Sequence, residues 1–253
     1  MRSSEPSKLN ILVSYAYMDK NVENVLVANK DRIRFLLDSG AFTAWKLGKP
    51  ISLDNYCRYL ESTPIKPWRY FTLDVIGNAE LTLKNYETML KRGFNPIPVF
   101  TRGECTSMID EYYKTSDVVG IGGLVGSMDN KAFVNGIMKH VNNRNVHWLG
   151  FTPVDFIKHY KPYSCDSTTW QVGVIYARLD LYDDRLKRLV TIDKKLFLSK
   201  PKPRILELLR QHGIEPKSLA VKSNWIHTGR GCSPSELIGP RSWVKYSVDV
   251  EKT

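Results

Sequence analysis

Three aspartates stand directly after short apolar runs of the kind that form buried β-strands. Asp38 follows "FLL", Asp74 follows "YFTL" and Asp166 follows "YSC". In parallel α/β barrels the carboxyl ends of the strands meet at one mouth, where the chemistry collects. Carboxyl groups gathered there can divide nucleophilic and acid/base work, because their surroundings push their pKa values apart. Each aspartate taken alone fits an ordinary turn or helix cap equally well.

The elements that would position these aspartates alternate along the chain up to about residue 170. The strands expected from short apolar runs are Asn10–Tyr17, Ile33–Leu37, Tyr70–Leu73, Ile97–Phe100, Val118–Ile121, Val146–Leu149 and Tyr163–Cys165. The helices expected from apolar periodicity and capping residues are Ser52–Leu60, Glu80–Lys91, Ser107–Lys114, Lys131–Val141 and Pro203–His212. Such alternation implies parallel pairing through right-handed crossovers. It predicts a (β/α)8 TIM-like barrel, regular or irregular, whereas fewer units would indicate an open doubly wound sheet.

Length and composition fit one large domain. The 253 residues are 42% hydrophobic, and α/β barrels of this size form single domains. We expect one barrel domain over residues 1–253, in which 171–253 either completes the barrel or forms a basic appendage that faces nucleic acid. The sequence has no apolar run of the ~18 residues that a membrane span needs. Four widely separated cysteines without a CxxC pair favour a reducing cytoplasm.

The charge is strongly positive and locally concentrated. Lys and Arg number 37 against 26 Asp and Glu, a net charge of +11. A basic but merely solvated surface would explain this, yet clustering favours contact with nucleic acid. The nine basic residues of the densest stretch are Arg178, Arg185, Lys187, Arg188, Lys194, Lys195, Lys200, Lys202 and Arg204. Trp170, Trp225 and Trp243 could hold an opened strand beside them by stacking.

The segment "GIGGLVGS" follows the fifth expected strand and lacks the spacing of a nucleotide-binding loop. Its glycines either make a tight turn or let a flat ligand lie against bare backbone. Phe42 or Trp45 could stack on such a ligand. The five histidines show neither metal spacing nor a Ser/His/Asp order, which favours structural or surface roles for them.

Four motifs together resemble those of the tRNA-guanine transglycosylases. "LDSGAF" is similar to their DSGG[FY] segment, "GIGGLVGS" to GGL-x-VGE, "HWLGF" to LMGxG, and "SCDSTTW" to FD[CS]xxPT. The matches lie in the family's order and span about residues 33–170. The "DSTTW" ending and the short chain look closer to the phage and bacterial 7-deazaguanine DNA transglycosylases than to the tRNA enzymes.

The resemblance implies a role for each matched residue. Asp166 would be the nucleophile and Asp38 the general acid/base, while Asp74 would bind the edge of a guanine-like base. The other residues expected to bind substrate are Ser39, Gly40, Phe42, Arg102, Gly122, Gly123, Leu124 and Gly150.

The chain also departs from the family pattern. The CxCxxC…H zinc site of the tRNA enzymes is missing, so their tRNA-docking subdomain is not expected. Ser127 stands where the family has glutamate after VG. Arg102 or Thr101 stands near the position of the base-reading glutamine.

These implications predict a pentosyltransferase that exchanges guanine in DNA for a preQ0-type 7-deazaguanine base, with no metal and no other cofactor. The partners would be DNA and the free base, with tRNA as the alternative nucleic acid and no membrane. A non-catalytic nucleic-acid-binding protein on a degenerate barrel would explain the charge but would leave the aspartates without a use. The sequence leaves open whether the protein forms a homodimer.

Overall fold

A computed structural model describes residues 8–124, 129–168, 176–220, 225 and 241–243. The chain divides into two compact units. Unit 1 contains Met1–Thr152 and Tyr160–Asp166, and unit 2 contains Pro153–His159 and Ser167–Thr253. All three candidate aspartates belong to unit 1. The prediction of a single domain over 1–253 remains a prediction, and the two units are described separately.

Unit 1 is built on seven short parallel strands. They are β1 (Leu9–Ser14), β2 (Ile33–Asp38), β3 (Arg69–Tyr70), β4 (Val99–Phe100), β5 (Val118–Ile121), β6 (Asn145–Trp148) and β7 (Ser164–Cys165). Strands β1, β2 and β3 form one sheet and β4 to β7 a second, each in sequence order. A parallel bridge between Phe71 and Ile97 joins the edges of the two sheets. Each strand therefore lies beside its neighbours in sequence, without the reversal of strand order found in doubly wound sheets.

The joined sheets curve, as a contact across their inner face shows. The rings of Phe71, next to β3, and His147, on β6, lie with their centroids 4.9 Å apart. These residues belong to strands that are not neighbours in the sheet. Their contact requires the strands to bend around a common interior. The predicted α/β fold with parallel sheets is thus confirmed.

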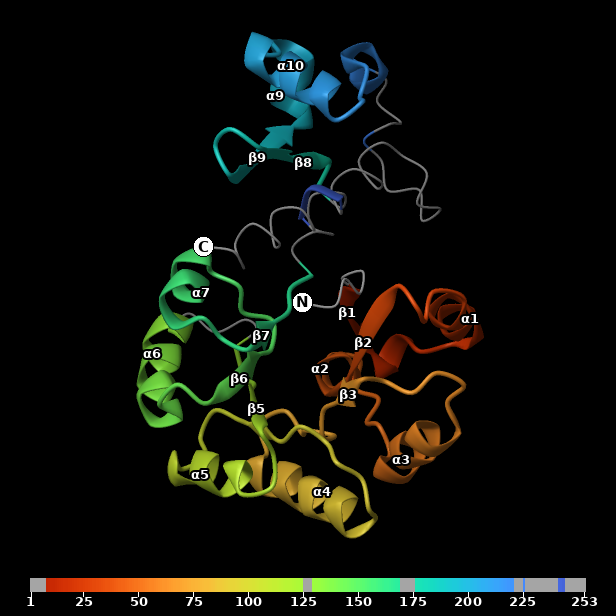
Figure 1. The fold of residues 1–253 in the computed structure, drawn as a ribbon, viewed down its shortest axis with the longest axis vertical. Coiled ribbons are helices and arrows are strands. Elements are labelled where there is room, and N and C mark those ends of the chain that lie inside the picture. Colours follow the sequence, from red (N-terminus) through yellow and green to blue (C-terminus); the bar gives the residue numbers. More distant parts are fainter. Residues whose placement is uncertain (1–7, 125–128, 169–175, 221–224, 226–240, 244–253) are drawn as a thin grey trace, which may run out of the picture. The chain divides into compact units, whose positions relative to one another are not determined.

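Helices follow most of the strands in unit 1 and lie around them (Figure 1). They are α1 (Lys20–Ala28), α2 (Ala41–Lys46), α3 (Leu53–Ser62), α4 (Ala79–Lys91), α5 (Ser107–Tyr113) and α6 (Asn130–Val141), with a 3-10 turn η1 (Tyr15–Tyr17) after β1. Their starts follow from capping chemistry. Asp19, Ser52 and Asn78 each accept a hydrogen bond from a backbone N–H in the first turn of the helix that follows. Helix α7 (Val154–Tyr160) lies mostly in unit 2.

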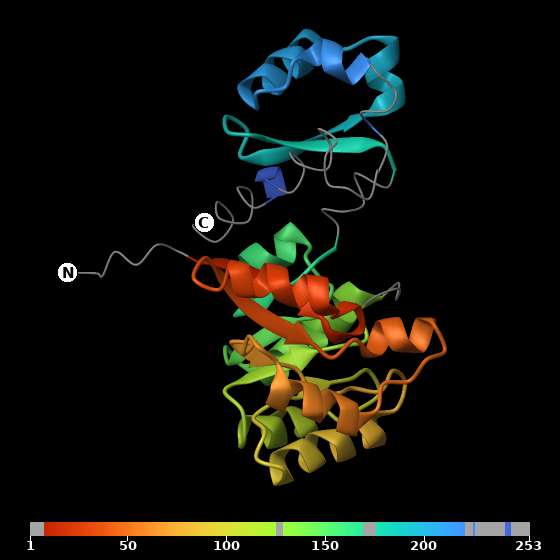
Figure 2. The same ribbon diagram turned by 90° about the vertical axis from the view of Figure 1, so that its right-hand side faces the viewer.

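The described part of unit 2 is an antiparallel hairpin covered by helices. Strands β8 (Arg178–Asp183) and β9 (Arg188–Asp193) pair over their full length. Helices α9 (Lys194–Ser199) and α10 (Pro203–Gln211) and the 3-10 turn η2 (Pro216–Ala220) lie over one face of it (Figure 2). Leu179, Leu181 and Ile192 point from the hairpin into the core between these layers.

The elements expected from sequence match the structure closely up to residue 165. All seven expected strands overlap an observed strand, although the first ends at Ser14 rather than Tyr17 and the third, expected over Tyr70–Leu73, shares only Tyr70 with β3. The expected helices lie within two residues of their predicted bounds, and Gly213 ends α10 in a left-handed conformation (φ 72°). The predictions missed α1, α2, α7, α9 and the β8–β9 hairpin.

Gly40 is the glycine on which the turn after β2 depends. It has φ 81°, and a Cβ atom placed there would lie 2.7 Å from the backbone nitrogen of Ala16 and 2.8 Å from its Cβ. Any side chain would therefore combine backbone strain with a clash against η1.

We predict that Gly40→Ala lowers the free energy of unfolding of unit 1 by about 1–3 kcal/mol more than Gly93→Ala. Gly93 is the matched control, because it has a similar φ of 84° but open space around its Cα. Both variants carry the left-handed backbone cost of about 1–2 kcal/mol. Urea denaturation, with hydrogen exchange of β1 and β2 to assign the transition, measures the difference. Equal losses in the two variants would contradict the steric role of Gly40.

Candidate active site

Asp38 is the last residue of β2 and lies opposite Ser14 of β1 in the strand register. The backbone N–H of Gly40 donates to its Oδ2 over 3.0 Å. Burial raises the pKa of Asp38 above its usual value, while the Gly40 N–H and the Ser14 hydroxyl oppose that rise. The negative charge of Asp166 raises this pKa further, and His147 lowers it. Asp38 therefore lies within electrostatic reach of a residue 128 positions away in the sequence.

Asp74 follows β3 and is tied to the turn after β2. The Ser39 hydroxyl donates to its Oδ1 over 2.6 Å, and Ser39 is completely buried. Burial raises the pKa of Asp74 to about 6, against the Ser39 hydrogen bond, and the neighbouring charge of Asp38 adds to the rise. Near neutral pH the carboxyl group of Asp74 thus changes charge easily, which suits a group that pairs with a ligand of variable protonation.

Asp166 directly follows β7 and is held from one side. Its Oδ1 accepts a hydrogen bond from the Gly150 N–H over 2.9 Å and lies 3.2 Å from Nε2 of His147. Its side chain is 22% exposed, so it remains accessible to a substrate. Asp38 therefore lies within electrostatic reach of both Asp166 and Asp74, and the three residues follow three different strands.

Asp74 forms part of the wall of an apolar cavity of about 430 Å³, whereas neither Asp38 nor Asp166 is among the residues that line it. Helix α2 lines one side of this cavity with Ala41, Ala44 and Trp45. Leu73 and Val75 line another part beside Asp74. A cavity of this size can accept a flat heterocycle whose polar edge meets the carboxyl group.

Several predicted substrate-binding residues have structural tasks as well. The Gly122 N–H donates to the Phe100 carbonyl over 2.9 Å, so it is engaged in strand pairing. A Cβ at Gly122 would lie 3.0 Å from Cγ1 of Val99, so a side chain there would require the Val99 side chain to shift. Gly123 is exposed in a left-handed conformation (φ 67°) and Leu124 is buried. The continuation of this loop, 125–128, including Ser127, lies outside the described residues.

Arg102 holds the glycine loop against α6. Its Nε donates to the Gly123 carbonyl over 3.3 Å, and its terminal nitrogens bind Asp129 and Asn130. The guanidinium carbon also lies 4.1 Å from the ring centroid of Phe133. These contacts give Arg102 a clear scaffolding role, so a role in reading the base would require it to leave them. The neighbouring Thr101 is likewise engaged, because its hydroxyl donates to Glu104 over 2.6 Å.

Aromatic side chains lie on α2, immediately after the turn that carries Asp38. Phe42 is 39% exposed and Trp45 is 61% exposed, and their ring centroids are 5.9 Å apart. Both remain available for stacking on a ligand. Gly150, which was expected to contact substrate, supplies the N–H group that holds Asp166.

The structure adds residues that sequence reasoning missed. His147 was assigned to the structural or surface histidines, yet it is 2% exposed and lies beside both Asp166 and Asp38. Its Nδ1 lies 2.8 Å from the Ser164 hydroxyl. Tyr56 is completely buried within electrostatic reach of Asp38 and Asp74, and its hydroxyl donates to the Phe71 carbonyl over 2.8 Å. The available signal was the position of His147 as the next-to-last residue of β6, close to the carboxyl end of that strand, where the candidate aspartates of the other strands also lie.

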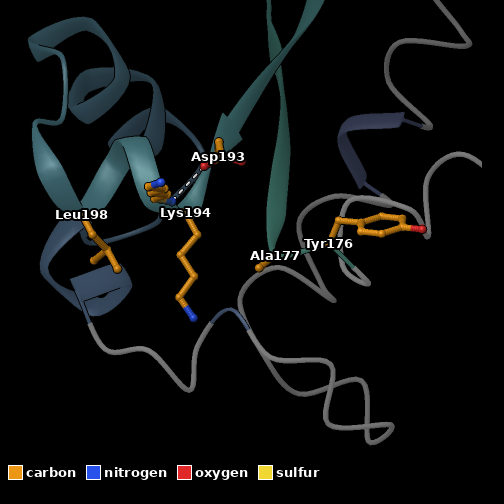
Figure 3. Close-up of a pocket in the computed structure, with 6 residues that line it drawn as sticks. Tyr176, Ala177, Asp193, Lys194 and Leu198 are labelled. Carbon is orange, nitrogen blue, oxygen red and sulfur yellow. Dashed lines mark hydrogen bonds between the residues drawn. The ribbon is translucent and has the colours of Figure 1, made fainter.

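The basic stretch of unit 2 is partly neutralised. Arg178 lies 3.9 Å from Asp193, and Arg204 forms an ion pair with Asp183. Arg185, Lys187, Arg188, Lys195, Lys200 and Lys202 are exposed, and Lys194 is half-buried. Lys194 and Lys195 also line a shallow pocket of about 390 Å³ with Asp193 and Tyr176 (Figure 3). An exposed positive surface on this unit is therefore present.

Of the three tryptophans predicted to stack on an opened strand, Trp225 is placed where it cannot do so. Trp225 is completely buried in the core of unit 2, where its Nε1 donates to the Leu219 carbonyl over 2.6 Å. This prediction was wrong, because an apolar core between hairpin and helices needed a large side chain there. Trp243 is half-buried and donates to Asp180 over 3.0 Å. Trp170 lies outside the described residues.

Comparison with family models, with curated proteins and with solved structures gave no match to this chain. Among the described residues, no helix has the length and apolar character needed to cross a bilayer. Within the same residues, no three His, Cys, Asp or Glu side chains are grouped as metal ligands. The site is therefore interpreted from its own geometry.

The raised pKa of Asp74 predicts a specific pH dependence of stability. The folded protein binds a proton at Asp74 more tightly than the unfolded chain does, since the pKa rises from 3.8 to about 6. The stabilisation that Asp74 gains from binding this proton is fully present below about pH 4 and is lost as the pH rises through about 6. Relative to Asp74→Asn, which keeps an acceptor for Ser39, the wild type should lose on the order of 2 kcal/mol between pH 4 and 7. Parallel curves of unfolding free energy against pH for the two proteins would refute the assignment.

Proposed function

We propose that this protein is a DNA-guanine transglycosylase, which exchanges guanine in DNA for a preQ0-type 7-deazaguanine base. The observation that carries the proposal is the grouping of Asp38, Asp74 and Asp166 from the ends of three parallel strands. Their order in the chain agrees with the transglycosylase-like motifs. Within this proposal the seven ordered strands of unit 1 belong to a (β/α)8-like barrel, whose mouth holds the site.

The chemistry proceeds by double displacement. The Asp166 carboxylate attacks C1′ of the target nucleotide, and the N-glycosidic bond breaks with its electron pair going to guanine. Asp38, protonated at that moment, gives its proton to the departing guanine. The incoming 7-deazaguanine then loses a proton to Asp38 and attacks C1′ as the ester bond to Asp166 breaks. The DNA backbone stays intact, and both carboxyl groups return to their starting states.

The surroundings of each group suit this division of work. Burial and the negative charge of Asp166 favour the protonated form of Asp38, as an acid needs. Gly150 and His147 both approach Oδ1 of Asp166, so its Oδ2 is the oxygen assigned to the attack. Asp74 and the adjoining cavity provide a carboxyl group and an apolar wall for the edge and faces of the base. No cofactor is needed for these steps.

The nucleic-acid partner must present an unstacked nucleotide to the site. DNA is favoured because the chain lacks the zinc motif of the tRNA enzymes, and the exposed lysines and arginines of unit 2 suit a phosphate backbone. A tRNA-directed transglycosylase remains the second candidate, because it would use the same carboxyl groups. Radiolabelled guanine offered with duplex DNA and with tRNA in parallel assays separates the two. A cytoplasmic location, and the use of the free base as co-substrate, belong to the same proposal.

We expect Asp166→Asn to abolish incorporation of labelled guanine into DNA, because the amide cannot form the glycosyl ester. Its affinity for DNA should stay within about threefold of the wild type, since one neutralised side chain changes few phosphate contacts. The matched control is Asp110→Asn on the outer helix α5, which removes an exposed carboxylate that pairs with Arg144. Full exchange activity in a folded Asp166→Asn protein would end the nucleophile assignment. A wild-type protein that binds DNA but exchanges no guanine would favour the alternative of a non-catalytic nucleic-acid-binding protein.

The exposed basic residues of unit 2 predict salt-sensitive DNA binding. Raising salt from 50 to 200 mM should weaken the affinity at least about tenfold, because each phosphate contact releases counterions. Replacing Lys200 and Lys202 by glutamate should weaken binding and flatten the slope of log affinity against log salt. Lys30→Glu, at an exposed position of unit 1, is the control for general charge. A slope near zero for the wild type would contradict phosphate contact.

A further inference from the structure

His147 occupies a position that the double-displacement chemistry does not by itself require. Its imidazole is almost completely buried, and its ring packs against Phe71 at 4.9 Å between centroids. Both of its nitrogens nevertheless have polar neighbours. Nδ1 lies 2.8 Å from the Ser164 hydroxyl, and Nε2 lies 3.2 Å from Oδ1 of Asp166. A buried imidazole with two such neighbours is fixed in place and in orientation.

The Asp166 carboxylate can only accept a hydrogen bond, so it favours the proton of the neutral ring on Nε2, and the Ser164 hydroxyl, which can donate or accept, then donates to Nδ1. When that hydroxyl donates to Nδ1, the ring proton must sit on Nε2, where it points at Asp166. The Gly150 N–H, at 2.9 Å, approaches the same oxygen. Both donors therefore end on Oδ1, and within the described part of the chain no donor contacts Oδ2.

From this geometry we infer that His147 is a positioning residue for the nucleophile: it acts with the Gly150 N–H to hold Oδ1 of Asp166, so that Oδ2 is presented to C1′, and Ser164 supports the Nε2–H tautomer by donating to Nδ1. The inference rests on the proposed transglycosylase function. In the first step Oδ2 forms the bond to C1′ while Oδ1 becomes the ester carbonyl oxygen. In the second step the C1′–Oδ2 bond breaks and the electron pair returns to the carboxylate. The two N–H donors on Oδ1 stabilise that returning charge, as donors in an oxyanion hole do.

The charged groups around the ring are consistent with this role. Asp38 from the end of β2 and Asp166 after β7 face it, and Phe71 after β3 covers it on another side. His147 lowers the pKa of Asp38 and so couples the two carboxyl groups. Losing the imidazole would therefore disturb the attacking group directly and the acid/base group through space.

Two substitutions at position 147 separate positioning from packing. His147→Gln keeps an N–H group able to reach Oδ1, whereas His147→Leu keeps the apolar bulk and removes the donor. We expect His147→Leu to lower kcat for guanine exchange about tenfold to a hundredfold, with KM for DNA and for the base within about threefold of wild type. His147→Gln should stay within about fivefold of the wild-type kcat. Thermal melting of both variants monitors the fold.

Ser164→Ala gives a second test that leaves the packing of His147 intact. It should reduce kcat about twofold to tenfold in the otherwise wild-type protein, because Nδ1 loses its donor and the ring is held less firmly in the Nε2–H form, and it should have no effect in the His147→Gln background. Nitrogen-15 NMR of labelled histidine should show the Nε2–H form of His147 in the wild type and a mixture in Ser164→Ala. This readout does not depend on activity.

The outcomes distinguish the inference from the function beneath it. If the wild type exchanges guanine and a folded His147→Leu keeps full kcat, the positioning role is overturned and the function stands. Equal loss in folded His147→Leu and His147→Gln, or an Nδ1–H tautomer in the wild type, also overturns it. If the wild type exchanges guanine in neither DNA nor tRNA, the proposed function fails and the inference fails with it, even where the NMR spectrum shows the Nε2–H form.

Discussion

Parallel pairing in sequence order is the constraint on which the rest of unit 1 depends. Because each strand pairs with the next one in the chain and all run the same way, their carboxyl ends lie on one side of the curved sheet. Asp38, Asp74 and Asp166 follow three of these ends, so the backbone topology alone brings them to the same side. The contact of Phe71 with His147 shows that the curvature is enough for side chains of distant strands to meet.

The gathered carboxyl groups would repel one another without the donors that surround them. Burial and mutual charge both disfavour ionisation, which is why the pKa values of Asp38 and Asp74 are raised. Each group has its own local donor: the Gly40 N–H for Asp38, the Ser39 hydroxyl for Asp74 and the Gly150 N–H for Asp166. These donors lie in the turns that follow the strands, so the same turns that end the strands also make the acidic site tolerable. The result is a set of three carboxyl groups with three different environments.

The sequence predicted the parts of this arrangement that depend on local pattern. Apolar runs such as "FLLD" located the strands, and Ser52 and Asn78 located helix starts, because capping and burial act over a few residues. Contacts between distant segments were beyond such reasoning. His147 looked like any histidine until β6 and β7 placed it between Ser164 and Asp166. Arg102 appeared free to read a base, but its partners Asp129 and Asn130 come from the start of another helix.

Unit 2 also contains burial that local sequence patterns did not reveal. Leu179 and Leu181 alternate with polar residues in a strand pattern, yet the many charges of this stretch drew attention to nucleic acid instead. Their burial depends on helices that follow about 15 to 40 residues later in the chain, and the same helices, which precede Trp225, bury that residue too. A basic segment can thus be a folded hairpin with one apolar face, and both descriptions hold for the same residues.

The hydrogen bonds of Ser39 connect two parts of the site in one direction. The Ala41 N–H, at the start of α2, donates to the Ser39 oxygen over 3.2 Å. The Ser39 hydroxyl in turn donates its own hydrogen bond to Asp74. A hydroxyl group has a single proton, so this oxygen cannot serve any other acceptor while Asp74 is bound. Tilting the first turn of α2, for instance when a ring settles on Phe42, would therefore pull on a carboxyl group 35 residues further along the chain. Stacking of a ligand on α2 would then be coupled to the position of the Asp74 carboxyl group.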